Sequence, residues 1–516
     1  MAWLLASAFV ALQSAVLSLV NDTVKDDYMD EVFHGPQARE YCRGDFASWH
    51  PKITTFPGVY YLGTAYGWGR WAAQALVGKV VNTEEACSTP FLRSLNVLLS
   101  LACLLTTRAI LRHRRSHGRL APGQARGGPQ QQQAASDAAV SPGLHALVLA
   151  LYPLHWFFSF LYYTDVASLL FLLLCNLQAL RRSYLTAALA GAAAVLCRQT
   201  NAVWAAFVLG ESALAELGLA DAPWAAAGSG AGSSGPWRSP RKSGSSVAAG
   251  KGGAGQGGGE DEEAARADAA GLLPELGLAL SRAWQRRGRL AAALWPLLLP
   301  PVGFVAFLVA NGGAVVLGDK EAHVPVRHGA QLLYFGGWAA LMLWPQLLPE
   351  VGALGRAAAR RPMAAVVVAA GAVAAAAGVA HVSTLVHPYV LADNRHYVFY
   401  LWRRLLDRHR LARYALAPAN AAAWALLLSG LRRSASRLWL LGFLACVAAT
   451  LLPAWLLELR YFTPGLFLAA MRLRPPSPLQ AGALLATYAV VDAGSMFLFL
   501  RRPFIFADGS VARFMW

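Results

Sequence analysis

The sequence predicts an all-α polytopic membrane protein with about twelve transmembrane helices. Of its 516 residues, 56% are hydrophobic and 14% are charged, whereas soluble proteins carry about 25% charged residues. The apolar residues fall in runs of about 20, the length that crosses a hydrocarbon core of about 30 Å. A soluble multidomain enzyme is therefore excluded. The net charge of +17 comes from short arginine clusters between the apolar runs, which indicates membrane topology and no nucleic-acid partner.

The first apolar run, residues 2–20, is uncharged and has no basic residue before it. It fits either a signal anchor or a cleaved signal peptide, and both leave residue 21 outside the cytosol. The aromatic stretch 56–71 contains Arg70 and four glycines, so we expect it to lie on the membrane surface. The run 91–110 ends in an arginine cluster that contains no acid, and this places its end in the cytosol.

Four further spans complete an N-terminal transmembrane module, residues 1–221, which carries the first and second lumenal loops. These spans are 143–163, 166–180, 184–197 and 202–218. Arg181 and Arg182 mark the cytosolic side between two of them. Residues 222–290 are rich in Gly, Ala, Ser and Arg. We expect a disordered cytosolic insert there, because this composition buries little apolar surface.

The C-terminal transmembrane module, residues 291–516, repeats the alternation of apolar runs and arginines. Its predicted spans are 291–310, 330–348, 363–386, 414–431, 438–457 and 478–500, with a short apolar piece at 462–471. Between them, the loop 387–413 carries six arginines on the lumenal side: Arg395, Arg403, Arg404, Arg408, Arg410 and Arg413. The positive-inside rule disfavours arginines there, so we expect an anionic ligand, although Arg403 and Arg404 also fit an interfacial helix. The side of the C-terminus stays open.

Polar residues gather at the non-cytosolic ends of these spans. Ionisable residues at a membrane edge are costly, so such a group predicts function. A transferase that uses a lipid-phosphate sugar needs a carboxylate to deprotonate the acceptor hydroxyl and cations to hold the departing phosphate. The candidate residues are Asp30, Glu31, Asp165, Arg198, Lys320, His323, His328, Arg395, His396, Glu458 and Arg460.

Long motifs of this sequence closely resemble one family. They include YMDEVFHGPQAREYC (28–42), FLYYTD (160–165), RQTN (198–201), LADNRHYVFYLWRR (391–404) and LLELRYF (456–462). The chain resembles the dolichyl-phosphate-glucose-dependent alpha-1,2-glucosyltransferases of the endoplasmic reticulum membrane, over about 26–210 and 290–516. The resemblance implies a type C glycosyltransferase fold with a lumenal active site. It also implies an inverting transfer of the last glucose to the diglucosylated dolichyl-pyrophosphate oligosaccharide used in protein N-glycosylation.

The resemblance also implies roles for individual residues. An acid of the first lumenal loop is the catalytic base in related enzymes, which points to Asp30 with Glu31 as the rival, and the second-loop acid corresponds to Asp165. We expect Arg395, His396, Lys320, Arg198 and Arg460 to bind the substrate phosphate. No DxD motif occurs, and we expect neither a metal nor another cofactor.

Three points stay open at the level of sequence. A polytopic transporter or a non-catalytic interaction protein of the same fold would share the composition, although no inverted repeat supports the transporter. Cys42 and Cys87 are the cysteines of the first polar loop. An oxidising lumen permits them to pair, and they are about equally expected to be free. The oligomeric state is not determined.

Overall fold

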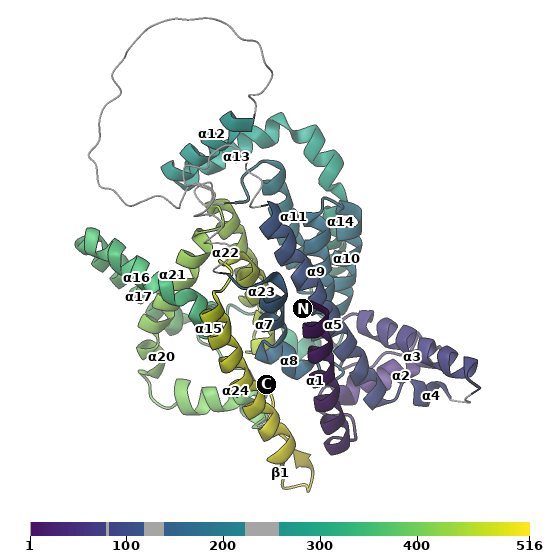
Figure 1. Ribbon diagram of the computed structural model, residues 1–516. Helices are drawn as coiled ribbons and strands as arrows, with labels where there is room; N and C mark the ends of the chain where they lie inside the picture. Colours follow the sequence, from purple (N-terminus) through teal and green to yellow (C-terminus); the bar gives the residue numbers. More distant parts are fainter. Residues whose placement is uncertain (1, 79–81, 118–138, 222–256) are drawn as a thin grey trace, which may run out of the picture.

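The computed structural model describes residues 2–78, 82–117, 139–221 and 257–516, and these residues are mostly helical (Figure 1). The exception is a short hairpin in which β1 (Phe504–Ile505) pairs antiparallel with β2 (Val511–Ala512). The described part of the chain contains six helices that are long and apolar enough to cross a membrane. These observations agree with a multi-pass membrane protein.

The N-terminal helices form two groups. α1 (Ala2–Thr23) and α5 (Thr89–His117) run along the bundle, whereas α2 (Glu31–Cys42), α3 (Gly58–Leu76) and α4 (Thr83–Ala86) extend sideways from it (Figure 1). The stretch predicted to lie on the membrane surface falls mainly in α3, and its orientation to a bilayer stays a prediction.

A disulfide bond between Cys42 and Cys87 holds the sideways group together. It joins the end of α2 to the residue that follows α4. Gly67 of α3 packs directly against it, since a Cβ atom at this position would lie 2.1 Å from the Cys87 sulfur. A residue larger than glycine would force α3 away from the bridge. The pairing that the sequence left open is therefore present.

The next helices are α7 (Pro142–Ala150), α8 (Pro153–Phe158), α9 (Asp165–Leu180), α10 (Tyr184–Cys197) and α11 (Asn201–Glu216). The last three match the predicted spans closely. The span predicted over 143–163 is not one continuous helix. Pro153 has no amide hydrogen and its ring disfavours a helical residue before it, so the helix breaks at Leu151 and Tyr152.

The predicted disordered insert is wrong for its second half, and its residues 222–256 lie outside the described residues. Residues from 257 onward form α12 (Gly257–Ala270), α13 (Leu272–Gln285) and the start of α14 (Arg287–Ala310). Asp268 of α12 pairs with Arg432 and Arg437 of the C-terminal module, and Arg282 donates to the Leu217 carbonyl at 2.9 Å. Ion pairs therefore hold α12, which has no large apolar residue, whereas α13 also packs Leu278 and Ala279 against Leu217 and Leu219.

The C-terminal module contains longer helices and short ones between them, and the residues of α23 (Thr463–Arg472) are almost all buried in the core. The long ones are α15 (Ala330–Met342), α16 (Trp344–Arg360), α17 (Pro362–Val382), α21 (Ala417–Arg432), α22 (Arg437–Leu451), α23 (Thr463–Arg472) and α24 (Pro478–Arg501). The short ones are η2 (Lys320–His323), α18 (Pro388–Ala392), α19 (Tyr397–Leu401), the single π turn η3 (Trp402–Leu406), α20 (Ala412–Ala415) and η4 (Leu459–Phe462). The span predicted over 330–348 is divided at Leu343, because Pro345 starts α16 as a new helix.

The described residues contain six long apolar helices, which is fewer than the twelve spans predicted from the sequence. Three further described helices are apolar but shorter: Asp165–Leu180, Tyr184–Cys197 and Arg437–Leu451. Several predicted spans are divided, as at Pro153 and Pro345, so that their pieces are too short to be counted. The number of crossings therefore stays a prediction.

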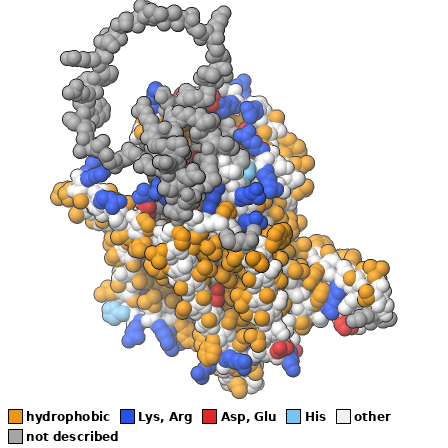
Figure 2. Space-filling model, viewed as in Figure 1, with side chains coloured by type: hydrophobic (Ala, Val, Ile, Leu, Met, Phe, Trp, Pro, Cys, Tyr) orange, Lys and Arg blue, Asp and Glu red, His pale blue; other side chains and the backbone are white. Residues whose placement is uncertain are grey.

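One hydrophobic core joins the two modules. Phe207 of α11 packs edge-on against Trp439 of α22, with ring centroids 5.3 Å apart, and Tyr152 packs against Phe467 of α23. On the outside, hydrophobic side chains cover the middle of the face in Figure 2, while Lys and Arg gather toward its two ends. This distribution is typical of a protein surrounded by lipid, since apolar surface is stable there and charged side chains prefer the aqueous interfaces.

Candidate active site

Five charged side chains from distant parts of the sequence meet in one cluster. Arg198 donates to Asp165 at 2.5 Å, and the second oxygen of Asp165 lies 3.6 Å from Arg460. Arg460 also donates to Asp30 at 3.2 Å and to Glu458 at 2.5 Å. Arg460 is therefore the centre of the cluster, because its guanidinium contacts all three carboxylates.

Each member of the cluster lies at an end of an element. Asp30 directly precedes α2, and its amide donates to the Tyr163 hydroxyl at 3.0 Å. Asp165 is the first residue of α9, where a carboxylate interacts favourably with the helix dipole. Arg198 follows α10 in an extended conformation, and Arg460 lies in the short η4. The neighbouring helices α9 and α10 thus bring Asp165 and Arg198 together.

The charges of the cluster hold one another in place. Burial alone would raise the pKa of Glu458, but the Arg460 guanidinium, with Arg198 and His396, outweighs this effect and lowers the pKa to about 2. Burial opposes the charge of Arg460 as well, yet Glu458, Asp165 and Asp30 raise its pKa. Three carboxylates and two guanidiniums leave one negative charge, so these five side chains alone do not form an anion site.

Asp30 is the most accessible carboxylate of the cluster. Its side chain is 37% exposed, compared with 13% for Asp165 and 19% for Glu458. A cavity of about 20 Å³ lies beside Asp165, Arg198 and Arg460, and it has room for about one water molecule. A sugar substrate does not fit there. The arrangement therefore leaves Asp30 as the carboxylate that a large substrate reaches.

Glu31, the rival of Asp30, is enclosed by donors. It is completely buried, and Arg93 binds both of its oxygens at 2.6 and 2.9 Å. The amides of Tyr28 and Tyr162 donate to the same carboxylate at 3.1 and 2.6 Å. This ion pair fixes the turn that precedes α2. Glu31 thus lies next to the cluster in sequence but has no open face toward it.

Two of the predicted phosphate ligands flank the cluster. Arg395 binds the Asp393 carboxylate through two nitrogens at 2.8 Å. Arg395 interacts electrostatically with Tyr163, and His396 with Glu458. His396 lies 3.0 Å from the Trp516 carbonyl through Nδ1. Asp393 compensates the charge of Arg395, so this pair offers a guanidinium donor but adds no net charge.

Lys320 lies in a different group. Its ammonium donates to Asn311 at 2.7 Å. The preceding residue, Asp319, pairs with Lys52 at 2.9 Å, and the amides of residues 317–319 donate to backbone carbonyls of residues 51–54. The structure therefore does not bring Lys320 to the Asp30 cluster. Asp319 has a positive φ of 47°, and the backbone turns there beside residues 51–54 of the first loop.

The sequence analysis missed His34 and did not give Glu458 a role. His34 lies one helical turn after Asp30, its Nδ1 is 2.6 Å from the Tyr60 hydroxyl, and burial lowers its pKa to about 4. A spacing of four residues on α2 could have indicated His34. The two-residue spacing of Glu458 and Arg460 could likewise have indicated a pair. Among the described side chains, no group of three His, Cys, Asp or Glu could hold a metal ion, and a reaction without a metal stays a prediction.

Comparisons with known proteins identify the family. The profile of the DIE2/ALG10 family matches residues 24–471. A protein of Arabidopsis thaliana named Dol-P-Glc:Glc(2)Man(9)GlcNAc(2)-PP-Dol alpha-1,2-glucosyltransferase is 34% identical, with 96% of each chain covered. Proteins of the same name from Rattus norvegicus and Homo sapiens are 30% and 29% identical, with 97% of this chain and 95% of theirs covered. The comparison with solved structures found no match. The similarity extends over nearly the whole chain, and the chain belongs to the DIE2/ALG10 family.

Proposed function

We propose that this protein is an inverting glucosyltransferase of the endoplasmic reticulum membrane. It moves glucose from dolichyl phosphate glucose to the diglucosylated dolichyl-pyrophosphate oligosaccharide, in alpha-1,2 linkage. The family and the name of its relatives support this proposal. The observation that carries the mechanism is the accessible carboxylate of Asp30 held beside Arg460. The site lies on the lumenal side, as expected from the arginine pattern of the sequence.

Asp30 is the catalytic base in this proposal. It takes the proton of the acceptor 2-hydroxyl while the hydroxyl oxygen attacks the glucose anomeric carbon. The bond between this carbon and the phosphate oxygen breaks on the opposite face, and its electron pair leaves with dolichyl phosphate. The configuration is therefore inverted, as in single-displacement glycoside chemistry. A phosphate is a good leaving group, so the reaction needs no general acid.

Arg395 and His396 hold the departing phosphate. The five-membered cluster carries a net negative charge, whereas the Arg395 guanidinium is compensated by Asp393 and is partly exposed, so it can donate hydrogen bonds to a phosphate. Arg198 and Arg460 neutralise the negative charges of Asp165 and Glu458. The only carboxylate of the cluster that could repel a bound phosphate is then Asp30, the base. Glu31 is structural in this proposal, since Arg93 and two amides occupy its oxygens.

The experiment is a transfer assay with the purified full chain. Dolichyl phosphate glucose labelled in the sugar is incubated with the diglucosylated lipid-linked oligosaccharide, and the product is examined for a third, alpha-1,2-linked glucose. We expect transfer by the wild-type chain and almost none by Asp30→Asn. No transfer by the wild-type chain, or equal transfer from dolichyl phosphate mannose, would contradict the proposal.

A further inference from the structure

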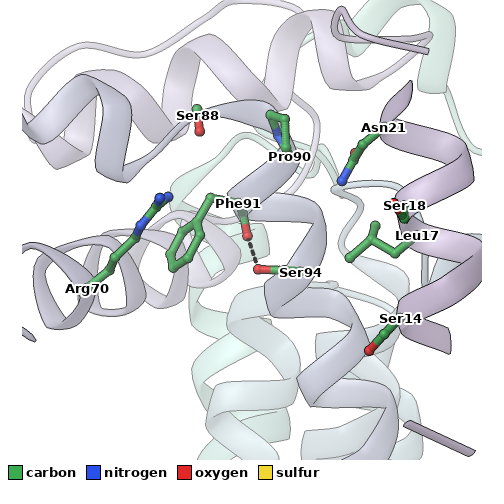
Figure 3. A pocket seen from close by; sticks show the side chains of 9 residues that line it. All are labelled: Ser14, Leu17, Ser18, Asn21, Arg70, Ser88, Pro90, Phe91 and Ser94. Atoms are coloured by element: carbon green, nitrogen blue, oxygen red, sulfur yellow. Dashed lines mark hydrogen bonds between the residues drawn. The ribbon is translucent and has the colours of Figure 1, made fainter. Parts of the chain in front are cut away.

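A second polar cavity lies beside α1. It has a volume of about 410 Å³ and lies between α1, the end of α3 and the start of α5 (Figure 3). Ser14, Leu17, Ser18 and Asn21 line it from one face of α1, because a spacing of three and four residues puts side chains on the same side of a helix. We call this cavity the α1 groove.

The α1 groove has the composition of a phosphate site. Across from α1 it is lined by Ser88, Ser94 and Phe91, and Arg70 lies at one end with its guanidinium 4.0 Å from the centre of the Phe91 ring. None of the nine lining residues is acidic. Among the described side chains, no carboxylate contacts Arg70. The first turn of α5, which carries the positive end of a helix dipole, also faces this cavity.

The groove lies near Asp30 but is separated from it. Asn21 accepts from Arg93 at 3.2 Å, and Arg93 in turn binds Glu31, the neighbour of Asp30. The buried Arg93–Glu31 pair therefore stands between the two sites. A phosphate in the α1 groove would not be the phosphate that leaves during glucose transfer.

The proposed reaction requires a second phosphate site of this kind. Its acceptor, by the name of the relatives, is a dolichyl diphosphate that carries thirteen sugars. The acceptor reacts at its terminal glucose, so its diphosphate stays at the membrane edge while the glucose lies at Asp30. The donor phosphate, in contrast, must lie beside Asp30 itself.

We propose that the α1 groove binds the diphosphate of the acceptor lipid, an inference that rests on the proposed function. Arg70 and the hydroxyls of Ser14, Ser18 and Ser88 bind the diphosphate oxygens, whereas the Ser94 hydroxyl donates to the Phe91 carbonyl at 2.6 Å. The polyprenyl chain lies along the outer surface of α1, where Leu12 and Leu19 are each 49% exposed. Polar residues on a membrane helix are costly unless they contact a polar partner, and this ligand supplies one.

The test separates the two lipid substrates in steady-state kinetics of the full chain. We expect Arg70→Gln to raise the KM for the oligosaccharide lipid about tenfold, with kcat and the KM for dolichyl phosphate glucose unchanged. Ser18→Phe, which fills the groove and keeps the charge, is expected to have the same selective effect. Arg43→Gln is the matched control, since Arg43 is exposed on α2 and does not line the groove. Equal KM values for wild type and both groove variants, or a raised KM for the donor, would overturn the proposal.

Competition experiments test whether the ligand of the α1 groove is a dolichyl diphosphate. Dolichyl diphosphate without sugars should inhibit the wild-type chain competitively with the acceptor and should inhibit Arg70→Gln about tenfold less. Equal inhibition by dioleoyl phosphatidic acid would show a site for any lipid phosphate and would overturn the specific assignment. Equilibrium binding of labelled dolichyl diphosphate to the two full chains tests the groove without turnover. A chain that bound it through Arg70 but transferred no glucose would refute the proposed function alone.

Discussion

Asp30 is the residue whose chemistry can be tested most directly. Asp30→Asn keeps the shape of the side chain and its contact with Arg460 but cannot accept a proton at the same oxygen. We expect turnover to fall about a hundredfold or more while both lipid substrates still bind. Initial rates and substrate binding of the purified variant measure this. Normal turnover of Asp30→Asn together with an inactive, folded Asp165→Asn would move the base to Asp165.

Arg395 tests the phosphate contact. Its guanidinium is partly exposed and fixed by Asp393, so it can bind a phosphate without a large rearrangement. We expect Arg395→Ala to raise the KM for dolichyl phosphate glucose about tenfold, which corresponds to about 1.4 kcal/mol and to one charge-assisted hydrogen bond. Arg502→Ala removes a charge elsewhere, over Phe497, and should leave this KM unchanged. If both variants behave like wild type, Arg395 does not bind the donor phosphate.

Glu458 should make the stability of the protein sensitive to acid. Its pKa falls from an ordinary value of 4.5 to about 2 in the folded chain. A carboxylate with a lowered pKa stabilises the fold above its unfolded pKa, and this stabilisation is lost as the pH falls from about 4.5 to about 2. We expect Glu458→Gln to lose roughly 2 kcal/mol at pH 7, with a difference from wild type that shrinks below pH 4.5.

Thermal unfolding at pH 7, 4.5 and 3 measures this difference. Glu40→Gln is the control, because Glu40 forms an exposed pair with Arg43 that contributes little to stability. A constant difference between wild type and Glu458→Gln at all three pH values would contradict the prediction.

The sequence could predict part of this cluster. Asp30, Asp165, Arg198 and Arg460 stand at predicted span ends on one side, and the structure brings these four together. Sequence alone could not decide whether Asp30 or Glu31 is the base, because the two adjacent acids lie in the same motif and the same predicted loop. The difference depends on Arg93, which lies 62 residues after Glu31 and encloses only one of the two. Lys320 is a candidate because of its charge and because it is predicted on the lumenal side of the membrane. Neither property determines where on that side it lies.

At the scale of elements, proline positions account for most differences from the prediction. Apolar runs give the positions of α9, α10 and α11 almost to the residue, because each run is short and ends at polar residues. The runs that contain Pro153 or Pro345 are equally apolar, but they do not form one helix each. Hydropathy averages over a window and does not register the missing amide hydrogen of a proline.

Because helices begin at residue 257, the predicted insert 222–290 can be tested in two parts. We expect a deletion of 225–255 to leave transfer activity near the wild-type level, because the described contacts of the insert begin at α12. A deletion of 225–275 also removes Asp268, which pairs with Arg432 and Arg437, and should lower the melting temperature and the yield of folded protein. Equal stability of the two deletions would show that α12 contributes nothing.

The Cys42–Cys87 bridge should stabilise the sideways group of helices. It closes a loop with a sequence separation of 45 residues, for which the loss of unfolded-state entropy contributes about 4 kcal/mol. We expect Cys42→Ser to lower the melting temperature and to release one reactive thiol, that of Cys87. Thiol titration of the unreduced, denatured chain and thermal unfolding measure both effects. Two additional reactive thiols in the unreduced wild-type chain, compared with Cys42→Ser/Cys87→Ser, would refute the bridge.

At the scale of the whole molecule, the two modules share both the core and the cluster. Asp30, Asp165 and Arg198 come from residues 1–221, whereas Glu458 and Arg460 come from residues 291–516. The apolar pattern predicts the modules separately. How the two modules pack together depends on side-chain shapes, such as that of Phe207 against Trp439. The periodicity of apolar residues gives no information on these shapes.

The position of Arg460 also determines when the cluster is completed during protein synthesis. Asp165 and Arg198 leave the ribosome close together and can pair at once, but Arg460 follows Asp165 by 295 positions (460 less 165). At about 5–20 residues per second, this interval is about 15–60 s. Throughout that time Asp30 and Asp165 lack their shared cation, and most of the helices are made before Arg460 is synthesised. A nascent chain therefore completes this charged cluster only near the end of translation.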